Sequence, residues 1–248
     1  MTTYDPPAVL AAITANRPAV VLIGGLSIVA MFVFFIEAAR MGRRDRVTPM
    51  ALSMTVLWWP HDGSYLLHFS DWFSRWDHWF MKLFWFAIVV TFLAESTYLV
   101  QTIRYARDEL SPGLSQPLHT ARVLGALAAG VVSWVLIKGA ASDELYLLTF
   151  MLTLLWGGPS GSALLGRRPD ARGQSVLEWV GFTTMAVMYS ITSIFFFGGG
   201  FFQAWPYVAL CVLASVWSAV HLRQIWLSPA PLASWTPRRE RTPAAIAV

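Results

Sequence analysis

Charged side chains are scarce in this sequence. Asp, Glu, Lys and Arg make up 13% of the 248 residues, about half of the ~25% that soluble domains carry. Hydrophobic residues make up 56% of the chain, and aromatic residues make up 15%. This balance excludes an ordinary soluble domain and indicates a polytopic membrane protein. The net charge of +4 comes with no basic-aromatic module, so no nucleic-acid partner is expected.

Cysteine and lysine are nearly absent. A single cysteine, Cys211, excludes both an internal disulfide and a zinc cluster built from cysteine. The two lysines, Lys82 and Lys138, lie outside the last apolar run, which excludes a retinal protein with a Schiff-base lysine there. A serine hydrolase would need a Gly-x-Ser-x-Gly elbow. Residues 158–162 do not supply one, and their Gly-Pro-Ser-Gly-Ser sequence predicts a helix break instead.

Long apolar runs are what the chain has in abundance. Each is close to the ~20 residues that cross ~30 Å of hydrocarbon. We expect an all-α bundle of seven transmembrane helices over residues 19–226, flanked by an external segment, 1–18, and a flexible cytoplasmic tail, 227–248. Six spans is the alternative count, because the second run carries several polar residues. The runs are 19–38, 49–69, 79–103, 121–138, 144–165, 176–197 and 202–225.

Positive charges are unequally divided between the two sides of this bundle. With seven alternating spans, fourteen of the eighteen Lys and Arg residues fall on one side and four on the other. Cytoplasmic loops carry the excess of positive charge, so we expect an external N-terminus and a cytoplasmic C-terminus. Arginine outnumbers lysine 16 to 2 in an alanine-rich chain, which is typical of a GC-rich genome. The expected location is a bacterial inner membrane, crossed several times by the chain.

The second run contains an ionisable pair, His61 and Asp62, directly after Pro60. A charge inside hydrocarbon costs about 2.5–3.5 kcal/mol or more unless it is paired or hydrated. A carboxyl group held there tends to keep its proton, which makes Asp62 a candidate acid. The proline frees a carbonyl one turn earlier and favours a kink.

Three other carboxyl groups lie in the apolar runs. Glu95 is about two turns from the end of the third run, where a functional role and a helix-helix hydrogen bond are equally plausible. Glu37 and Glu178 lie within about a turn of the cytoplasmic ends. There we expect the side chains to reach water.

Residues 61–78 hold three histidines and three aspartates. Imidazole and carboxylate suit zinc or iron, so a metal-dependent enzyme using His61, His68 and His78 is one alternative. The spacing matches no ligand pair on one helical face. The neighbouring tryptophans are typical of an interfacial aromatic belt. We therefore predict no metal ligand and no cofactor.

Three short patches resemble the integral-membrane terpene cyclases of fungal meroterpenoid and indole-diterpene pathways. That family also has seven short spans and an external N-terminus. Together the patches cover roughly residues 40–185, and the third is the most specific. They are Arg44-Asp45-Arg46 with Pro49-Met50-Ala51-Leu52, Trp59, Asp62 and Tyr65; Trp85 through Arg104-Tyr105-Ala106-Arg107-Asp108-Glu109; and Leu164-Leu165-Gly166-Arg167-Arg168 with Arg172-Gly173-Gln174-Ser175 and Gly181.

The sequence departs from that family at two acids. The family's second-span acid is a glutamate directly after tryptophan, whereas here Pro60 and His61 intervene before Asp62. The family's last-span aspartate has no counterpart in residues 213–220. Either His61 or Glu95 substitutes for it, or the chemistry differs.

The resemblance implies a membrane-embedded isoprenoid cyclase or isomerase that protonates an epoxide or alkene of a prenylated lipophilic substrate. Carbocations are stabilised by aromatic faces. A non-enzymatic carrier or partner subunit for a lipid-like molecule remains the other alternative. The predicted catalytic residues are Asp62, His61 and Glu95, and the predicted substrate-binding residues are Trp58, Trp59, Tyr65, Trp85 and Tyr98.

Overall fold

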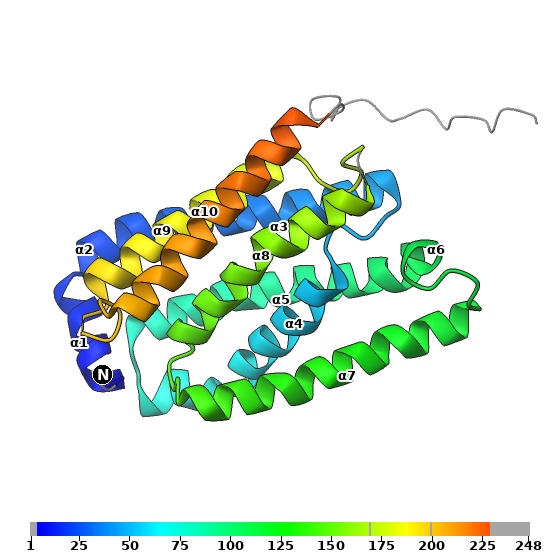
Figure 1. The fold of residues 1–248 in the computed structure, drawn as a ribbon. Helices are drawn as coiled ribbons and strands as arrows, with labels where there is room; N and C mark the ends of the chain where they lie inside the picture. The colour runs from blue at the N-terminus through cyan, green and yellow to red at the C-terminus, as the bar shows by residue number, and fades with distance from the viewer. Residues whose placement is uncertain (1–3, 169, 199, 229–248) are drawn as a thin grey trace, which may run out of the picture.

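The computed structural model describes residues 4–168, 170–198 and 200–228. Every regular element within these ranges is a helix (Figure 1), which confirms the all-α prediction. The elements are α1 (Pro6–Ala15), α2 (Arg17–Ala19), the π-helical turn η1 (Val20–Gly24), α3 (Gly25–Asp45), α4 (Leu52–Leu67), a second π-helical turn η2 (Asp71–Arg75), α5 (Trp79–Tyr105), α6 (Arg107–Leu110), α7 (Gln116–Ala141), α8 (Leu147–Arg167), α9 (Val176–Phe196) and α10 (Trp205–Leu227).

Six stretches of helix are long and apolar enough to cross a membrane. The first is continuous from Arg17 to Asp45 and joins α2, η1 and α3; the others are α5, α7, α8, α9 and α10. Large apolar side chains on their outer faces are exposed, as a lipid-facing surface requires. Examples are Leu22, Ile36, Leu93, Val132 and Val216. The chain is therefore built as an integral multi-pass membrane protein.

The second predicted run forms a shorter helix than expected. We predicted a span over 49–69, whereas α4 covers Leu52–Leu67, 16 residues, and carries Pro60 inside it. At 1.5 Å per residue, α4 is about 24 Å long. It lies inside the bundle, packed against α5, α7 and α8.

The predicted break at residues 158–162 is wrong. Helix α8 continues through Pro159 to Arg167. Glycines on either side of the proline let neighbouring helices approach closely, and this packing outweighs the loss of one backbone hydrogen bond. A Cβ atom at Gly157 would lie 2.0 Å from the Phe182 ring, and one at Gly161 would lie 2.4 Å from the Trp179 ring.

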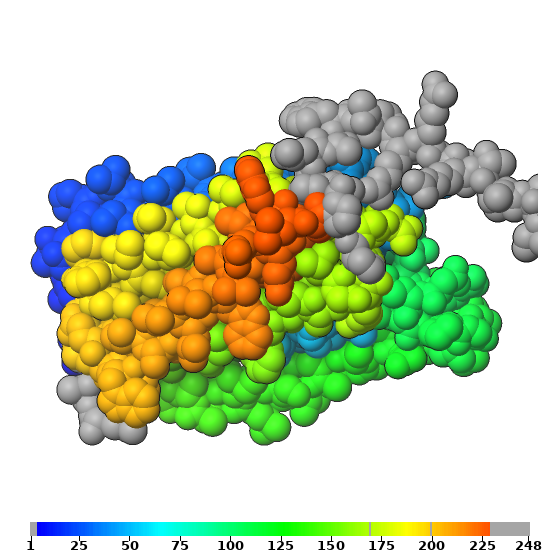
Figure 2. All heavy atoms as spheres, turned by 45° about the horizontal axis from the view of Figure 1, so that its top comes forward, coloured from blue at the N-terminus to red at the C-terminus, as the bar shows by residue number. Residues whose placement is uncertain are grey.

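The helices form two adjoining groups. Helix α3 packs along α9, while α10 packs on both α8 and α9. In the space-filling view α10 lies across α8 and closes this side of the bundle (Figure 2). Helix α7 runs along the opposite edge and contacts α4 (Figure 1). Rings from α3, α4 and α9 meet in the core, where Trp58 stacks on Phe182 at 6.0 Å and Phe34 packs against both.

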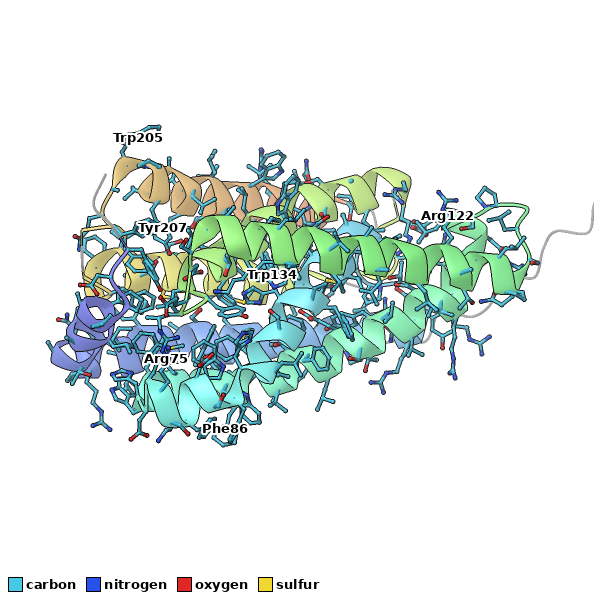
Figure 3. The ribbon with its side chains drawn as sticks, turned by 90° about the horizontal axis from the view of Figure 1, so that it is seen from below. Arg75, Phe86, Arg122, Trp134, Trp205 and Tyr207 are labelled. Atoms are coloured by element: carbon cyan, nitrogen blue, oxygen red, sulfur yellow. The ribbon has the colours of Figure 1, made fainter. Side chains whose placement is uncertain are left out.

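The two ends of the bundle differ in charge. All four cations predicted on the outer side lie at one end, where Arg75 is 2.7 Å from Glu144 and Lys82 is 2.5 Å from Asp77. Arg17 and Lys138 also lie there, over aromatic rings. We call the other end the arginine-rich end, because α3, α5 and α8 finish there in Arg43, Arg44, Arg104 and Arg167. Arg75 and Arg122 mark the two ends in Figure 3.

The segment after α4 folds back over the end of that helix. Trp72 of η2 stacks on Tyr65 with ring centroids 4.4 Å apart, and its indole N–H donates to the Tyr65 carbonyl oxygen at 2.7 Å. Both side chains are fully buried. The pair forms an aromatic plug between the interior and the end that carries Arg75.

The predicted flanks are only partly described. Helix α1, within the predicted external segment 1–18, packs on the bundle with Val9 and Ile13 fully buried. Residues 229–248, which include most of the predicted tail and three of the arginines counted on the cytoplasmic side, lie outside the described residues.

Candidate functional site

The site begins on α4, where Pro60 is followed by two buried ionisable residues. His61 is fully buried and Asp62 is 5% exposed. The Nδ1 atom of His61 lies 2.7 Å from Oδ1 of Asp62. A second hydrogen bond joins Oδ2 of Asp62 to the Thr91 hydroxyl on α5. Both oxygens of Asp62 are therefore held, one from its own helix and one from the neighbouring helix.

The surroundings of His61 favour its neutral form. Its Nε2 atom is buried and has no hydrogen-bond partner among the described residues. The rings of Trp134 and Phe150 lie 4.9 Å and 5.9 Å from the imidazole, and Trp134 points inward from α7 in Figure 3. An imidazolium would bury an N–H without an acceptor, which costs about 1–3 kcal/mol or more. The neutral tautomer with its proton on Nδ1, donating to Asp62, avoids this cost.

Glu95 lies one helical turn after Thr91 on the same face of α5. The side chain is 2% exposed, and its Oε2 atom is buried without a hydrogen-bond partner among the described residues. No ion pair is formed with it in that part of the chain. An uncompensated carboxylate there would cost several kcal/mol, so this environment favours a neutral carboxylic acid.

Asp62 and Glu95 face the same small cavity. The cavity has a volume of about 10 Å³, which is room for about one water molecule. The Trp58 indole N–H is turned out of it and donates to the Thr153 carbonyl oxygen at 3.0 Å. Most of the remaining wall is apolar or aromatic. It comprises Met31, Phe35, Trp58, Phe150, Thr153, Leu154 and Met185.

The five aromatic residues predicted to bind substrate occupy different places. Trp58 lines the cavity, and Tyr98 lies one layer behind, stacked on Phe35 with ring centroids 6.0 Å apart. Trp59, Tyr65 and Trp85 point elsewhere. Their polar atoms bond to Ser96, to the Met81 carbonyl and to the Leu66 carbonyl, respectively.

Several wall residues were not singled out from the sequence. Thr91 carries a weak signal, since it stands four residues before Glu95 and so shares its helical face. Met31, Phe35 and Phe150 carry no such signal. Each looks like any apolar core residue until the fold brings α3 and α8 to the same cavity.

The three histidines of residues 61–78 do not come together. His61 bonds Asp62, whereas His68 lies 2.6 Å from the Ser64 carbonyl oxygen and His78 lies 2.8 Å from the Thr14 hydroxyl. Among the described residues, no group of three His, Cys, Asp or Glu side chains is arranged to hold a metal ion. The geometry therefore offers no support for the metal-dependent alternative.

The other two membrane carboxyls have structural partners. Glu37 pairs with Arg40 at 2.6 Å and accepts from the Ser175 hydroxyl at 3.1 Å. The prediction that both side chains reach water is wrong: Glu37 is 6% exposed, and Glu178 is 1% exposed. Glu178 turns back to accept the Ser175 N–H in a capping box that starts α9.

The fold and the site define an all-helical, multi-pass membrane protein with two carboxyl groups facing one cavity in its interior. Comparison of the chain with protein-family models, curated proteins and solved structures finds no match. The chemistry of the site must therefore be derived from its own residues.

Proposed function

We propose that this protein is a membrane-embedded isoprenoid cyclase or isomerase that starts its reaction by protonating an alkene or epoxide of a prenylated lipophilic substrate. One observation carries the proposal: Asp62 and Glu95 face a single small cavity with a largely apolar and aromatic wall. A buried acid in a dry, apolar site is the arrangement that keeps a carboxyl group protonated and able to donate at neutral pH. The resemblance of the patches in residues 40–185 to the integral-membrane terpene cyclases supports the same class.

The hydrogen bonds around Asp62 fit a neutral acid. Thr91 has one hydroxyl proton, and the Ile88 carbonyl oxygen, 3.0 Å away, can accept it. A protonated Asp62 can then donate to the Thr91 oxygen, which is within hydrogen-bond distance, and accept the His61 N–H at its other oxygen. This arrangement places every proton and leaves no charge in the membrane interior.

The two carboxyls then have different roles. Asp62 is anchored through both oxygens, whereas Glu95 Oε2 has no hydrogen-bond partner among the residues that the structure describes. We assign the first proton transfer to Glu95. Asp62, which is held in place by His61 and Thr91, lies in the wall of the same cavity. Trp58, Phe35 and Phe150 offer aromatic faces to the carbocation, worth about 0.5–2 kcal/mol each. Ring closure ends when the cation loses a proton to the glutamate.

The topology belongs to the same proposal. We infer that α4 is a seventh membrane segment, that the N-terminus is external and that the C-terminus is cytoplasmic. The gathering of Arg43, Arg104 and Arg167 at one end of the bundle supports this orientation.

Carboxyl-to-amide substitutions test the assignment. We expect Asp62→Asn and Glu95→Gln, assayed in proteoliposomes with a prenylated, terminally epoxidised substrate and product analysis by mass spectrometry, each to lower turnover by about 10²-fold or more. Glu144→Gln is the matched control. This residue is exposed and pairs with Arg75 far from the cavity, so its turnover should match wild type.

Full turnover in Asp62→Asn and Glu95→Gln would falsify the acid assignment. Stoichiometric binding of the substrate by wild type with no conversion would favour the carrier alternative instead.

A further inference from the structure

The cavity at Asp62 and Glu95 is too small for a whole substrate. It has room for about one water molecule. Only a small reacting group, such as an epoxide or the end of an alkene, can enter without rearrangement. The rest of any prenylated molecule must therefore lie elsewhere in the protein.

A larger chamber lies directly beside this cavity. It has a volume of about 240 Å³ and lies between η1 and α3, the start of α5 and the end of α9. This volume is close to the lower end of the ~300–1,000 Å³ range of small-molecule sites. Val20, Ile28, Phe84 and Phe197 are among its wall residues. Met31 and Phe150 line both spaces. A flexible methionine and one ring are thus shared by the chamber and the acid cavity.

Three of the four polar side chains in the chamber wall already have hydrogen-bond partners. Ser27 donates to the Met185 carbonyl oxygen at 3.0 Å, Thr192 to the Met188 carbonyl at 2.7 Å and Tyr189 to the Leu147 carbonyl at 2.7 Å. The fourth is Trp79, whose indole N–H is buried and has no hydrogen-bond partner among the described residues. A sugar, phosphate or nucleotide would lose its hydration there without replacement. A hydrocarbon chain would lose nothing.

The chamber opens toward the lipid side of the bundle. Val21 on η1 and Leu83 on α5 both line it, and these side chains are 51% and 47% exposed. A ligand dissolved in the bilayer can therefore enter between α3 and α5 without crossing an aqueous phase.

We propose that this chamber binds the methyl-branched hydrocarbon chain of a substrate that enters from the bilayer, with the reacting end of the chain at Met31 and Phe150. The chain type rests on the proposed function, since cation cyclisation needs the alkenes of an isoprenoid. The position of the chamber rests on its own geometry. Met31 has unbranched, rotatable side-chain bonds, and it moves aside to admit the reacting group to the acids.

Photo-crosslinking in lipid nanodiscs tests this site. The probe is a geranylgeranyl chain that carries a diazirine, with adducts mapped by peptide mass spectrometry. In wild type we expect adducts on η1, α3, the first turns of α5 and the end of α9. Leu83→Trp, which fills the chamber, should lower labelling there by about five-fold or more. Leu93→Trp is the matched control, because Leu93 lies on the same helix, 62% exposed and outside the chamber wall.

Gly25→Leu is a second filling variant. A Cβ atom at Gly25 meets nothing within 4 Å, so we expect this variant to fold. It replaces Leu83→Trp in the test if that variant elutes abnormally on size exclusion. Unchanged labelling in both variants, or adducts spread evenly over α7 and α10, would overturn the site. Equal chamber labelling by a diazirine-bearing palmitoyl chain would overturn the isoprenoid occupant in favour of a lipid acyl chain.

The same measurement in Glu95→Gln separates the two proposals. We expect normal chamber labelling together with lost turnover. Retained turnover with normal labelling would contradict the acid but support the chamber. Lost labelling in this variant would contradict the claim that the chamber binds the hydrocarbon chain independently of the acid.

Discussion

At the scale of single residues, the buried carboxyl groups fall into two classes. They differ in the hydrogen bonds that their oxygens accept. Asp143 accepts hydrogen bonds from the N–H groups of Leu147 and Thr149 at the start of α8. Glu178 accepts one from the Ser175 N–H at the start of α9. These groups start helices. Glu95 caps no helix and faces a cavity, which sets it apart from the carboxyls with structural roles.

His78 lies outside the membrane segments and links α1 to the start of α5 through hydrogen bonds that depend on pH. Its Nδ1 accepts the Phe80 N–H at 3.3 Å, capping α5, and its Nε2 lies 2.8 Å from the Thr14 hydroxyl of α1. Burial lowers the pKa of His78 below its usual value of about 6.5. The folded state therefore favours neutral histidine, and its contribution is complete above the unfolded pKa and lost as pH falls below about 6.5.

We predict that the melting temperature in detergent falls between pH 7 and pH 5 more in wild type than in His78→Asn. Asparagine still caps the helix but does not titrate. The difference should correspond to about 1 kcal/mol or less, the usual worth of such a cap. Identical pH profiles for the two proteins would show that His78 does not contribute.

How much of the site could be predicted depends on sequence separation. His61, Asp62 and Glu95 stand out because ionisable residues in apolar runs are rare, and the structure brings the two acids to one cavity. Trp59 and Trp85 look equally promising in sequence, but their indoles bond to α5 and α4 rather than point inward. Spacing along a helix shows which residues share a face. It does not show which helix that face will meet.

At the scale of elements, Pro60 shapes the contact between α4 and α7. Proline has no N–H, so the Val56 carbonyl four residues earlier loses its partner within the helix. Gly130 of α7 packs directly against this carbonyl, and a Cβ atom there would lie 2.2 Å from the Val56 oxygen. A glycine and a proline on different helices therefore form one contact.

We predict that Gly130→Ala lowers the stability of the bundle by about 1–3 kcal/mol, since the added methyl overpacks this contact. Gly125→Ala on the same helix is the control. Its Cβ would meet nothing within 4 Å, so it should be neutral or slightly stabilising through helix propensity. Thermal unfolding in detergent measures both. Equal melting temperatures for the two variants would refute the close contact.

Element prediction succeeds where length and hydropathy decide the outcome. Six of the seven predicted runs correspond to helices able to cross a membrane. It fails at Pro159. The rule that proline and glycine break helices considers only the local sequence and leaves out packing against neighbouring helices. Phe182 and Trp179 fill the space beside Gly157 and Gly161, and α8 continues through Pro159 against these neighbours.

At the scale of the whole molecule, the division of charge between the two ends predicts which end faces the cytoplasm. Arg75 and Arg122 lie at opposite ends (Figure 3), and both are exposed. The one native cysteine, Cys211, is buried, so background labelling should be low. Arg75 pairs only at the surface, where an ion pair contributes little, so replacing it should not disturb the fold.

We predict that Arg75→Cys reacts with a membrane-impermeant maleimide in intact cells, whereas Arg122→Cys reacts only after permeabilisation. The reverse pattern would invert the proposed orientation. Reaction of both in intact cells would place the two ends on one side and contradict the bundle as a spanning unit.

The aromatic plug of Tyr65 and Trp72 also constrains the proton balance of the reaction. It closes the bundle between the acid pair and the end that carries Arg75, and on the other side the buried Tyr98 hydroxyl is bonded to the Phe35 carbonyl. Buried, hydrogen-bonded side chains therefore lie on both sides of the acid pair. Such a site suits a reaction in which the enzyme donates a proton to the substrate in the first step and accepts a proton from it in the last. Cyclisation ending in deprotonation, or double-bond migration, meets that condition in every turnover; net addition of water across a double bond would require the plug to open.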